Sequence, residues 1–348
     1  MAAMPMMRLL APAFWGAIAD RLGKKAVLVR NSMLVSALAF SGFLLTNNFI
    51  ALVAIMLVMS MFWSASLPLV EALTLGHLRN ATERYGSVRL WGSVGFIVAV
   101  QGSGLLLGWL PLDAILWVSL GLLLAASASA AYIPDTEILP YHRDAGPLSK
   151  ALLQPKVVAL LLAGFLMSVA HSPLYTFYSM HLVGHGYGKG SVGALWSLGV
   201  IAEIGVFAWM PKLMASGSLR KILAACFLLA ALRFALIGWL MDSPLIAVFA
   251  QLLHGASFGA HHAASITALN KWFSPRQQGT VQSLFGSISY GAGGVFGGVF
   301  SGYSWDAYGA SITYSGAALF ALLGLLLIWF GVSGEDGQLE RSGAIDVR

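Results

Sequence analysis

Residues 16–25 read Gly16-Ala17-Ile18-Ala19-Asp20-Arg21-Leu22-Gly23-Lys24-Lys25, a short basic turn between two long apolar stretches. The flanking stretches cover about 2–18 and 27–46. A helix needs about 20 mostly apolar residues to cross the roughly 30 Å hydrocarbon layer of a bilayer. The turn therefore predicts a hairpin of two membrane helices, and the rest of the chain continues the same alternation of apolar stretches and short polar turns.

The composition excludes a soluble globular protein. Hydrophobic residues make up 58% of the 348 residues and charged residues only 10%, whereas soluble domains carry about 25% charged residues. Backbone groups in lipid must be hydrogen-bonded within their own segment, and the stretches lack the alternation of barrel strands. We predict an all-α polytopic membrane protein with eleven spans, at about 2–18, 27–46, 49–76, 87–108, 111–132, 157–183, 190–211, 220–240, 244–269, 278–302 and 308–331.

The net charge of +6 reports membrane topology. Alternate loops and the C-terminal tail together carry sixteen Lys and Arg residues, while the opposite loops carry only Lys189. Basic loops stay in the cytoplasm, so the basic side and the C-terminus are predicted to be cytoplasmic. The basic balance therefore does not indicate a nucleic-acid partner, and we expect a bacterial inner-membrane protein that is monomeric in the bilayer.

The chain divides into two related halves. Gly86-Ser87-Val88-Arg89 and Gly279-Thr280-Val281-Gln282 lie 193 residues apart, and Trp15 and Trp209 lie 194 apart, which favours duplicated bundles with pseudo-two-fold symmetry. Shifted back by this offset, the span at 157–183 would fall before residue 1, so we predict that the first helix is missing through a truncated or misassigned start. The predicted parts are an incomplete N-terminal bundle, a cytoplasmic linker rich in proline, a six-helix bundle and a cytoplasmic tail, at 1–133, 134–155, 156–332 and 333–348.

Metal, cofactor and enzyme chemistry find no support in the sequence. The single cysteine, Cys226, excludes an intramolecular disulfide and most cysteine-based metal sites, and no H-E-x-x-H motif is present. No clustered nucleophile or phosphate-binding motif appears at a predicted membrane face. We predict neither a cofactor nor a metal, and a protein that is not an enzyme.

Five charged side chains, Arg8, Glu71, Arg89, Glu203 and Arg233, fall inside predicted spans. Each costs about 2.5 to 3.5 kcal/mol at the centre of a membrane helix, so each is expected to face a partner or a water-filled path. Arg8 has no acid at matching depth in the neighbouring helix, which leaves snorkelling to the membrane surface as an alternative.

The other four form two pairs, because the members of each pair are equally far along the chain from the turn that joins their helices. Glu71 and Arg89 are each nine residues from Asn80 in one polar turn, and Glu203 and Arg233 are each fifteen residues from Ser218 in another. At 1.5 Å per residue, each pair lies at equal depth. Each pair is either a buried structural ion pair or a site for substrate and protons. A buried carboxylate accepts a proton more readily once its arginine is drawn to a substrate, which would make a switch.

Histidines and aromatic residues add candidates. His254 and His261 are seven residues apart and thus on one helix face, while His171 lies in another span. An imidazole suits a proton path, although a histidine hydrogen-bonded between helices is the alternative for each. Phe96 lies on the face of Arg89, seven residues on. A cavity lined by a cation and aromatic faces would suit an aromatic acid or a sugar.

The opening stretch resembles the G-x-x-x-D-R-x-G-[RK]-[RK] loop between the second and third helices of the major facilitator superfamily. Every defined position of this gating motif matches, namely Gly16, Asp20, Arg21, Gly23, Lys24 and Lys25. Gly23 permits the tight turn, and the basic residues hold the loop in the cytoplasm. The resemblance implies two six-helix bundles that rock about a central site to give alternating access.

Within that superfamily, Pro68-Leu69-Val70-Glu71 and Tyr85 to Phe96 resemble the phenylpropionate permease branch, relatives of lactose permease. The resemblance implies that Glu71, Arg89 and Phe96 bind substrate, to which we add His171, and that Glu203, Arg233 and one of His254 or His261 couple protons. A second acid that the family uses for coupling has no counterpart here.

We therefore expect a proton symporter for a small organic solute. The solute that the residues favour is an aromatic acid such as 3-phenylpropionate. The alternatives are a sugar or nucleoside symporter, an exporter, a membrane enzyme, a sensor, and a non-transporting remnant.

Overall fold

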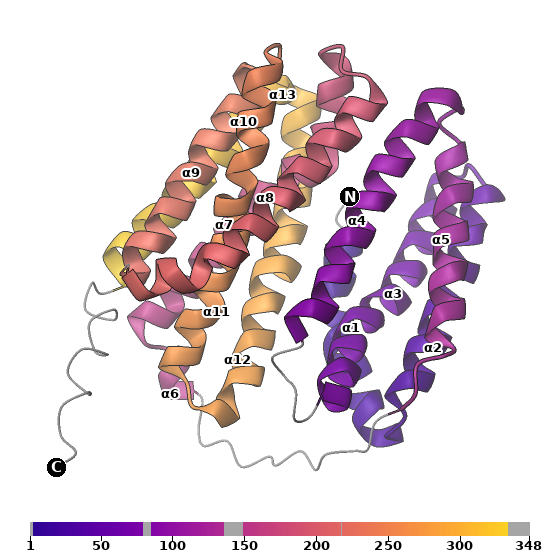
Figure 1. Ribbon diagram of the computed structural model, residues 1–348, viewed down its shortest axis with the longest axis horizontal. Helices are drawn as coiled ribbons and strands as arrows, with labels where there is room; N and C mark the ends of the chain where they lie inside the picture. The colour runs from indigo at the N-terminus through magenta and orange to yellow at the C-terminus, as the bar shows by residue number, and fades with distance from the viewer. Residues whose placement is uncertain (1–2, 79–84, 136–148, 217, 333–348) are drawn as a thin grey trace. The chain divides into compact units, whose positions relative to one another are not determined.

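The structure is a computed structural model, and it describes residues 3–78, 85–135, 149–216 and 218–332 (Figure 1). Every regular element in these ranges is a helix, as predicted. The chain forms two compact units, Met1–Tyr141 and His142–Arg348. Their boundary falls within the stretch predicted as a linker, and most of that stretch lies outside the described residues.

Five long helices build the first unit, joined by short turns. They are α1 (Ala3–Leu22), α2 (Lys25–Ser41, continued by the 3₁₀ turn η1, Gly42–Leu44), α3 (Phe49–Leu78), α4 (Tyr85–Trp109) and α5 (Ala114–Ala130). Helix α2 packs against α3 and α5, and α1 packs against α3 (Figure 1). The Trp15 indole of α1 donates a hydrogen bond of 2.8 Å to the Met61 carbonyl of α3, which ties the two helices together.

The motif turn between α1 and α2 is built around Gly23. This glycine has φ of 66°, a left-handed conformation that residues with a Cβ rarely adopt. The first turn of α2 contains no acidic residue, and its cap comes from far along the chain: Asp135 accepts a 3.1 Å hydrogen bond from the Ala26 backbone N–H. A carboxylate is favourable at this positive end of a helix, so Asp135 anchors the segment after α5 to the motif turn.

The second unit begins with the short α6 (Ser149–Leu152) and contains the better-buried core. Its elements are α7 (Pro155–Gly184), α8 (Lys189–Ser216), α9 (Leu219–Trp239), α10 (Pro244–His254), the π-helical turn η3 (Gly255–Ala260), α11 (His261–Trp272), α12 (Pro275–Gly286), the π-helical turn η4 (Ser287–Gly293) and α13 (Gly294–Gly331). Helix α13 packs along both α7 and α9. A Cβ on Gly293 would lie 2.7 Å from the Phe165 carbonyl oxygen, so this glycine lets η4 approach α7 closely.

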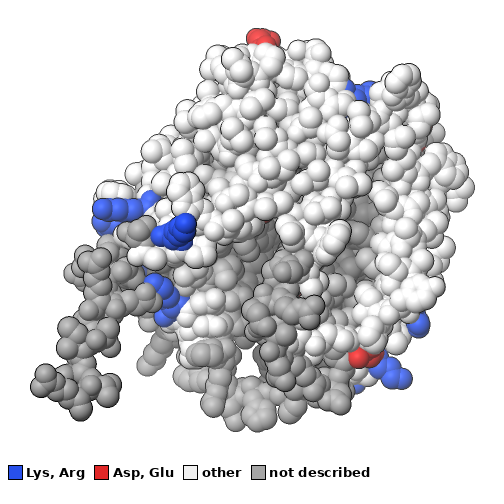
Figure 2. All heavy atoms as spheres, in the orientation of Figure 1, with Lys and Arg blue, Asp and Glu red and all other residues white. Residues whose placement is uncertain are grey.

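Seven helices in the described ranges are long and apolar enough to cross a membrane by length and composition. The last of them, Gln277–Gly331, contains two predicted spans, and Gly309, with φ of 77°, breaks it at the start of the second. Figure 2 shows a face on which almost all described atoms belong to uncharged residues. Large apolar side chains are exposed on the surface, including Trp109 at 91% and Phe330 at 82%. Such a surface requires lipid as its solvent.

Candidate functional site

Arg233 of α9 is completely buried in the second unit and uses its whole guanidinium as a hydrogen-bond donor. Its Nε donates to the Ala250 carbonyl at 2.9 Å, Nη2 to the Gln251 side-chain oxygen at 3.1 Å, and Nη1 to His254 Nδ1 at 2.9 Å and Ser257 Oγ at 3.3 Å. All four acceptors lie on α10 and the start of η3. Because an arginine fork has fixed geometry, these bonds lock α9 to the α10–η3 junction.

His254 connects this arginine to Glu203 of α8. Its Nδ1 accepts from Arg233, and its Nε2 lies 3.7 Å from Glu203 Oε2. Arginine can only donate, so Nδ1 is unprotonated in this arrangement, and the imidazole proton sits on Nε2, facing the carboxylate. We call Arg233, His254 and Glu203 the relay; it joins three helices through one titratable ring.

The predicted pairing of Glu203 with Arg233 is therefore indirect. Among the residues that the structure describes, no carboxylate forms an ion pair with Arg233. The alternative of a direct structural ion pair between the two is wrong. His254 lies between the two side chains and contacts both.

The π-helical turn η3 and its glycines bring α8 close enough for this contact. A Cβ on Gly255 would lie 2.6 Å from the Ala202 carbonyl oxygen, and one on Gly259 would lie 2.9 Å from Glu203 Cγ. The contact at Gly255 is with a backbone atom and cannot relax without moving a helix, whereas the contact at Gly259 is with the Glu203 side chain itself. The two glycines therefore set the spacing between His254 and Glu203.

We expect Gly255→Ala to force α8 away from η3, lengthen the contact between His254 and Glu203, and destabilise the protein by about 1–3 kcal/mol, as overpacking usually does. The matched control is Gly205→Ala on α8, where a Cβ would meet nothing within 4 Å. Thermal unfolding in detergent measures both variants. Equal unfolding midpoints for Gly255→Ala and Gly205→Ala would contradict the close approach.

His171 and His261 lie near the relay without joining it. His171 of α7 donates a hydrogen bond from Nδ1 to the Met167 carbonyl at 2.9 Å, and its ring centroid lies 6.3 Å from that of His254. The His261 ring packs edge-on against Phe227 of α9 at 5.2 Å. In the described part of the chain, the Nε2 atoms of both are buried without a hydrogen-bond partner. His171 thus shares its surroundings with the residues predicted for coupling.

In the first unit, the predicted substrate residues lie on α3 and α4. Glu71 is half-buried on α3, three residues after Pro68, and Phe96 on α4 is 42% exposed. The Arg89 side chain lies outside the described part, so its pairing with Glu71 stays a prediction. The surroundings of Arg8, Gly16 and Asp20 also lie outside the description. Arg21 and Lys24 are exposed, and Lys25 is half-buried at the start of α2.

The sequence analysis missed Gln251 and Ser257, whose side chains accept hydrogen bonds from Arg233. Both are buried, and with His254 they form a row of polar residues at three-residue spacing in an otherwise apolar span. Positions three apart lie on neighbouring faces of a helix. That spacing was the signal that could have found them.

A family model described as the MFS_1 like family matches residues 1–316. This chain belongs to that family of the major facilitator superfamily. The superfamily resemblance and the fold class expected from the sequence are thereby confirmed, and the chain is a multi-pass membrane transporter.

Relatives with curated descriptions agree with this membership. The major facilitator chain is 28% identical to a probable 3-phenylpropionic acid transporter of Escherichia coli (strain K12), over 79% of this chain and 73% of the relative. It is 23% identical to a maltose permease of Geobacillus stearothermophilus, over 93% and 82% respectively. Both relatives are named for a transported solute, and neither for an enzymatic reaction.

Solved structures share the fold. A point mutant of the nucleoside transporter NupG superposes with a TM-score of 0.84 at 15% identity, covering 95% of this chain and 89% of that one. The human organic anion transporter MFSD10 superposes with a TM-score of 0.62 at 19% identity, covering 94% and 82%. At these identities the likeness establishes the helical architecture and nothing about the solute.

Proposed function

We propose that this transporter is a proton symporter of the bacterial inner membrane, with its C-terminus in the cytoplasm, and that it imports an aromatic acid such as 3-phenylpropionate. The observation that carries the coupling is the relay, in which the buried His254 ring contacts the half-buried Glu203 carboxylate on one side and the buried Arg233 guanidinium on the other. The 28% identity to the probable 3-phenylpropionic acid transporter supports the class of solute.

The residues proposed to bind the substrate are Glu71, Arg89 and Phe96, and His171. Arg89 binds the carboxylate of the solute through its planar fork. Glu71 orients the solute. Phe96 and His171 offer rings to the aromatic part of the solute. The motif residues at 16–25 control the rocking between bundles.

The proton would be carried by Glu203 and His254. In the arrangement described, His254 Nδ1 accepts from Arg233 and Nε2 already carries the imidazole proton, so an added proton goes to the Glu203 carboxylate. A proton can be placed on Nδ1 only if its hydrogen bond with Arg233 breaks. Protonation of His254 is therefore linked to the contact between α9 and α10. The relay as defined contains a single acid, Glu203.

Charge balance favours an anionic solute. With Glu203 ionised and His254 neutral, the relay carries no net charge, and proton uptake leaves it at +1 through Arg233. A carboxylate solute compensates that charge, so acid and proton cross the membrane together without net charge movement. A neutral sugar would leave the added charge uncompensated in a medium where isolated charges are costly.

Uptake into proteoliposomes tests the proposal. An inward proton gradient is expected to drive labelled 3-phenylpropionate above equilibrium, and a protonophore to abolish the accumulation. Uptake that does not respond to the gradient would refute the coupling, while gradient-driven uptake of another solute would refute only the substrate.

A sugar is the second candidate, because the maltose permease matches 93% of this chain. Competition decides between them. Unlabelled maltose that displaces labelled phenylpropionate at lower concentration than phenylpropionate itself would favour a sugar, and uridine that does so would favour a nucleoside. Absence of exchange for every solute would favour a non-transporting protein.

A further inference from the structure

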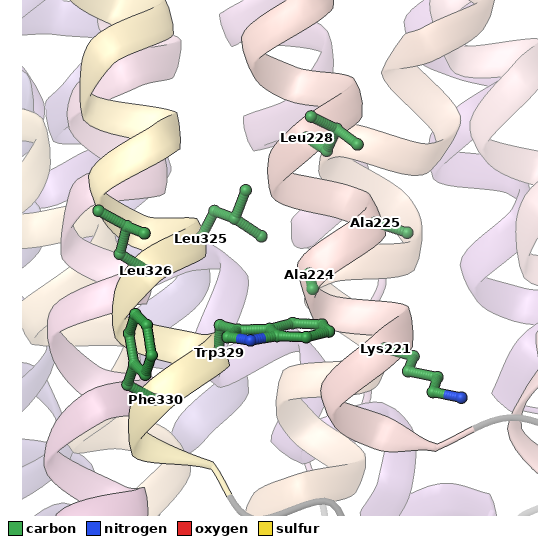
Figure 3. A pocket seen from close by; sticks show the side chains of 8 residues that line it. All are labelled: Lys221, Ala224, Ala225, Leu228, Leu325, Leu326, Trp329 and Phe330. Atoms are coloured by element: carbon green, nitrogen blue, oxygen red, sulfur yellow. The ribbon is translucent and has the colours of Figure 1, made fainter.

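An apolar groove runs along the surface of the second unit between the first turns of α9 and the last turns of α13 (Figure 3). Its volume is about 390 Å³, and its walls include Lys221, Ala224 and Leu228 of α9 and Leu325, Trp329 and Phe330 of α13. Figure 3 shows the Trp329 indole reaching across the space between the two helices, with Lys221 toward one end and Leu228 toward the other.

The groove has one basic end and one apolar end. Lys221 lies in the first turn of α9, and Leu228 lies seven residues further, about 10 Å along the helix axis. Among the described residues that form the walls, Lys221 alone is charged. Both helices are long and apolar enough to cross a membrane. With α9 spanning the bilayer, Lys221 in its first turn would lie at the depth of the lipid headgroups and Leu228 within the hydrocarbon.

Two cations stand at the basic end without an acidic partner in the described part of the chain. The Arg220 guanidinium lies 4.8 Å from the centre of the Trp329 ring. Among the residues described, neither Arg220 nor Lys221 has a hydrogen-bonding or ion-pairing acid, and the Arg220 Nε is buried without an acceptor.

Their position on the helix makes these cations unfavourable by themselves. They lie in the first turn of α9, which contains no acidic residue, and the Ser218 side chain at its N-cap makes no capping bond. The N-terminal end of a helix carries partial positive charge, so basic residues there are destabilised and an anion is stabilised. An external anion would relieve both the helix end and the two side chains.

We propose that this groove binds one anionic phospholipid, with its phosphate on Arg220 and Lys221 and an acyl chain lying along Trp329 toward Leu228. Long basic side chains at a helix end reach the headgroup layer. The indole separates the two regions, with its ring face toward the Arg220 cation and its edge along the acyl chain. The site is separate from the relay and independent of the solute transported.

Quenching of Trp329 by brominated lipid tests the proposal on the full chain in phosphatidylcholine vesicles. The vesicles contain a minor fraction of brominated phosphatidylglycerol or, in the parallel sample, brominated phosphatidylcholine. The contribution of Trp329 is the difference between the wild-type chain and Trp329→Phe. We expect apparent affinity for the anionic lipid to exceed that for phosphatidylcholine by about fivefold or more, the effect of one basic residue near an anionic surface.

Lys221→Gln and Arg220→Gln should each reduce this preference, while Lys271→Gln, an exposed lysine at the end of α11, should retain it. Equal quenching by the two lipids would overturn the proposal and leave the basic pair as a determinant of topology. Protection of Trp329 from both lipids would overturn it too and assign the groove to a second copy of the chain. A preference for the anionic lipid that appears only in the double variant Glu335→Gln with Asp336→Asn would overturn the proposal for the wild-type chain and assign the groove to the acidic tail.

Discussion

Replacing His254 with glutamine is expected to abolish proton-driven accumulation of solute while leaving exchange of solute across the membrane intact. Glutamine can still accept a hydrogen bond from Arg233, so the junction between α9 and α10 keeps its main contact. It cannot bind or release a proton, so Glu203 loses its titratable neighbour. Coupling free energies are typically worth a factor of about 5–150, and we expect the ratio of driven to equilibrium uptake to fall by that factor.

His262→Gln is the matched control for this experiment. His262 lies on the same helical run as His254, but its Nδ1 lies 3.0 Å from the Tyr290 hydroxyl and is not part of the relay. Driven uptake and counterflow of labelled 3-phenylpropionate, measured side by side in proteoliposomes, separate coupling from binding. Accumulation that survives in His254→Gln, or that falls equally in His262→Gln, would remove His254 from the proton path.

Replacing Arg233 with alanine should destabilise the second unit strongly. The substitution removes the donor to four buried acceptors, on Ala250, Gln251, His254 and Ser257, and opens a cavity beside Phe234. Removing one member of a buried polar network costs about 3–5 kcal/mol. For a unit of this size, that corresponds to a fall in the unfolding midpoint on the order of 10 °C.

Two further variants separate charge from volume. Arg233→Met refills most of the space without restoring the hydrogen bonds, and Arg233→Lys keeps the charge but loses the planar fork. We expect stability to rank as wild type, then lysine, then methionine, then alanine. The exposed Arg30→Ala is the control and should change stability by less than about 0.5 kcal/mol. An Arg233→Ala chain as stable as Arg30→Ala would show that the buried fork contributes nothing to the fold.

The relay and the π-helical turn are linked by geometry. Helix α10 ends at His254, and η3 begins at Gly255. A π-helical turn adds a residue to the helical repeat and often occurs at functional positions. Here it places His254 toward Arg233 and Ser257 toward the same guanidinium, while the glycines after His254 admit Glu203 from α8.

The amino-acid sequence alone determined the helices, their order and the motif turn. Lipid requires each backbone group to be paired within its own segment, so the length of an apolar stretch translates directly into a helix. The left-handed φ of Gly23 follows from the spacing of the turn. Equal depth of Glu203 and Arg233 followed from the fixed rise of a helix, and this was sufficient to bring their helices into one candidate site.

Only the tertiary structure decided how each helix is rotated about its axis. Apolar residues surround most of these helices, so the sequence contains little information about which face meets which neighbour. Packing of α8 against η3 at Gly255 and Gly259 determined that rotation, placed His254 between Glu203 and Arg233, and recruited Gln251. The physical reason is that depth depends on distance along one helix, whereas contact depends on side chains supplied by several helices at once.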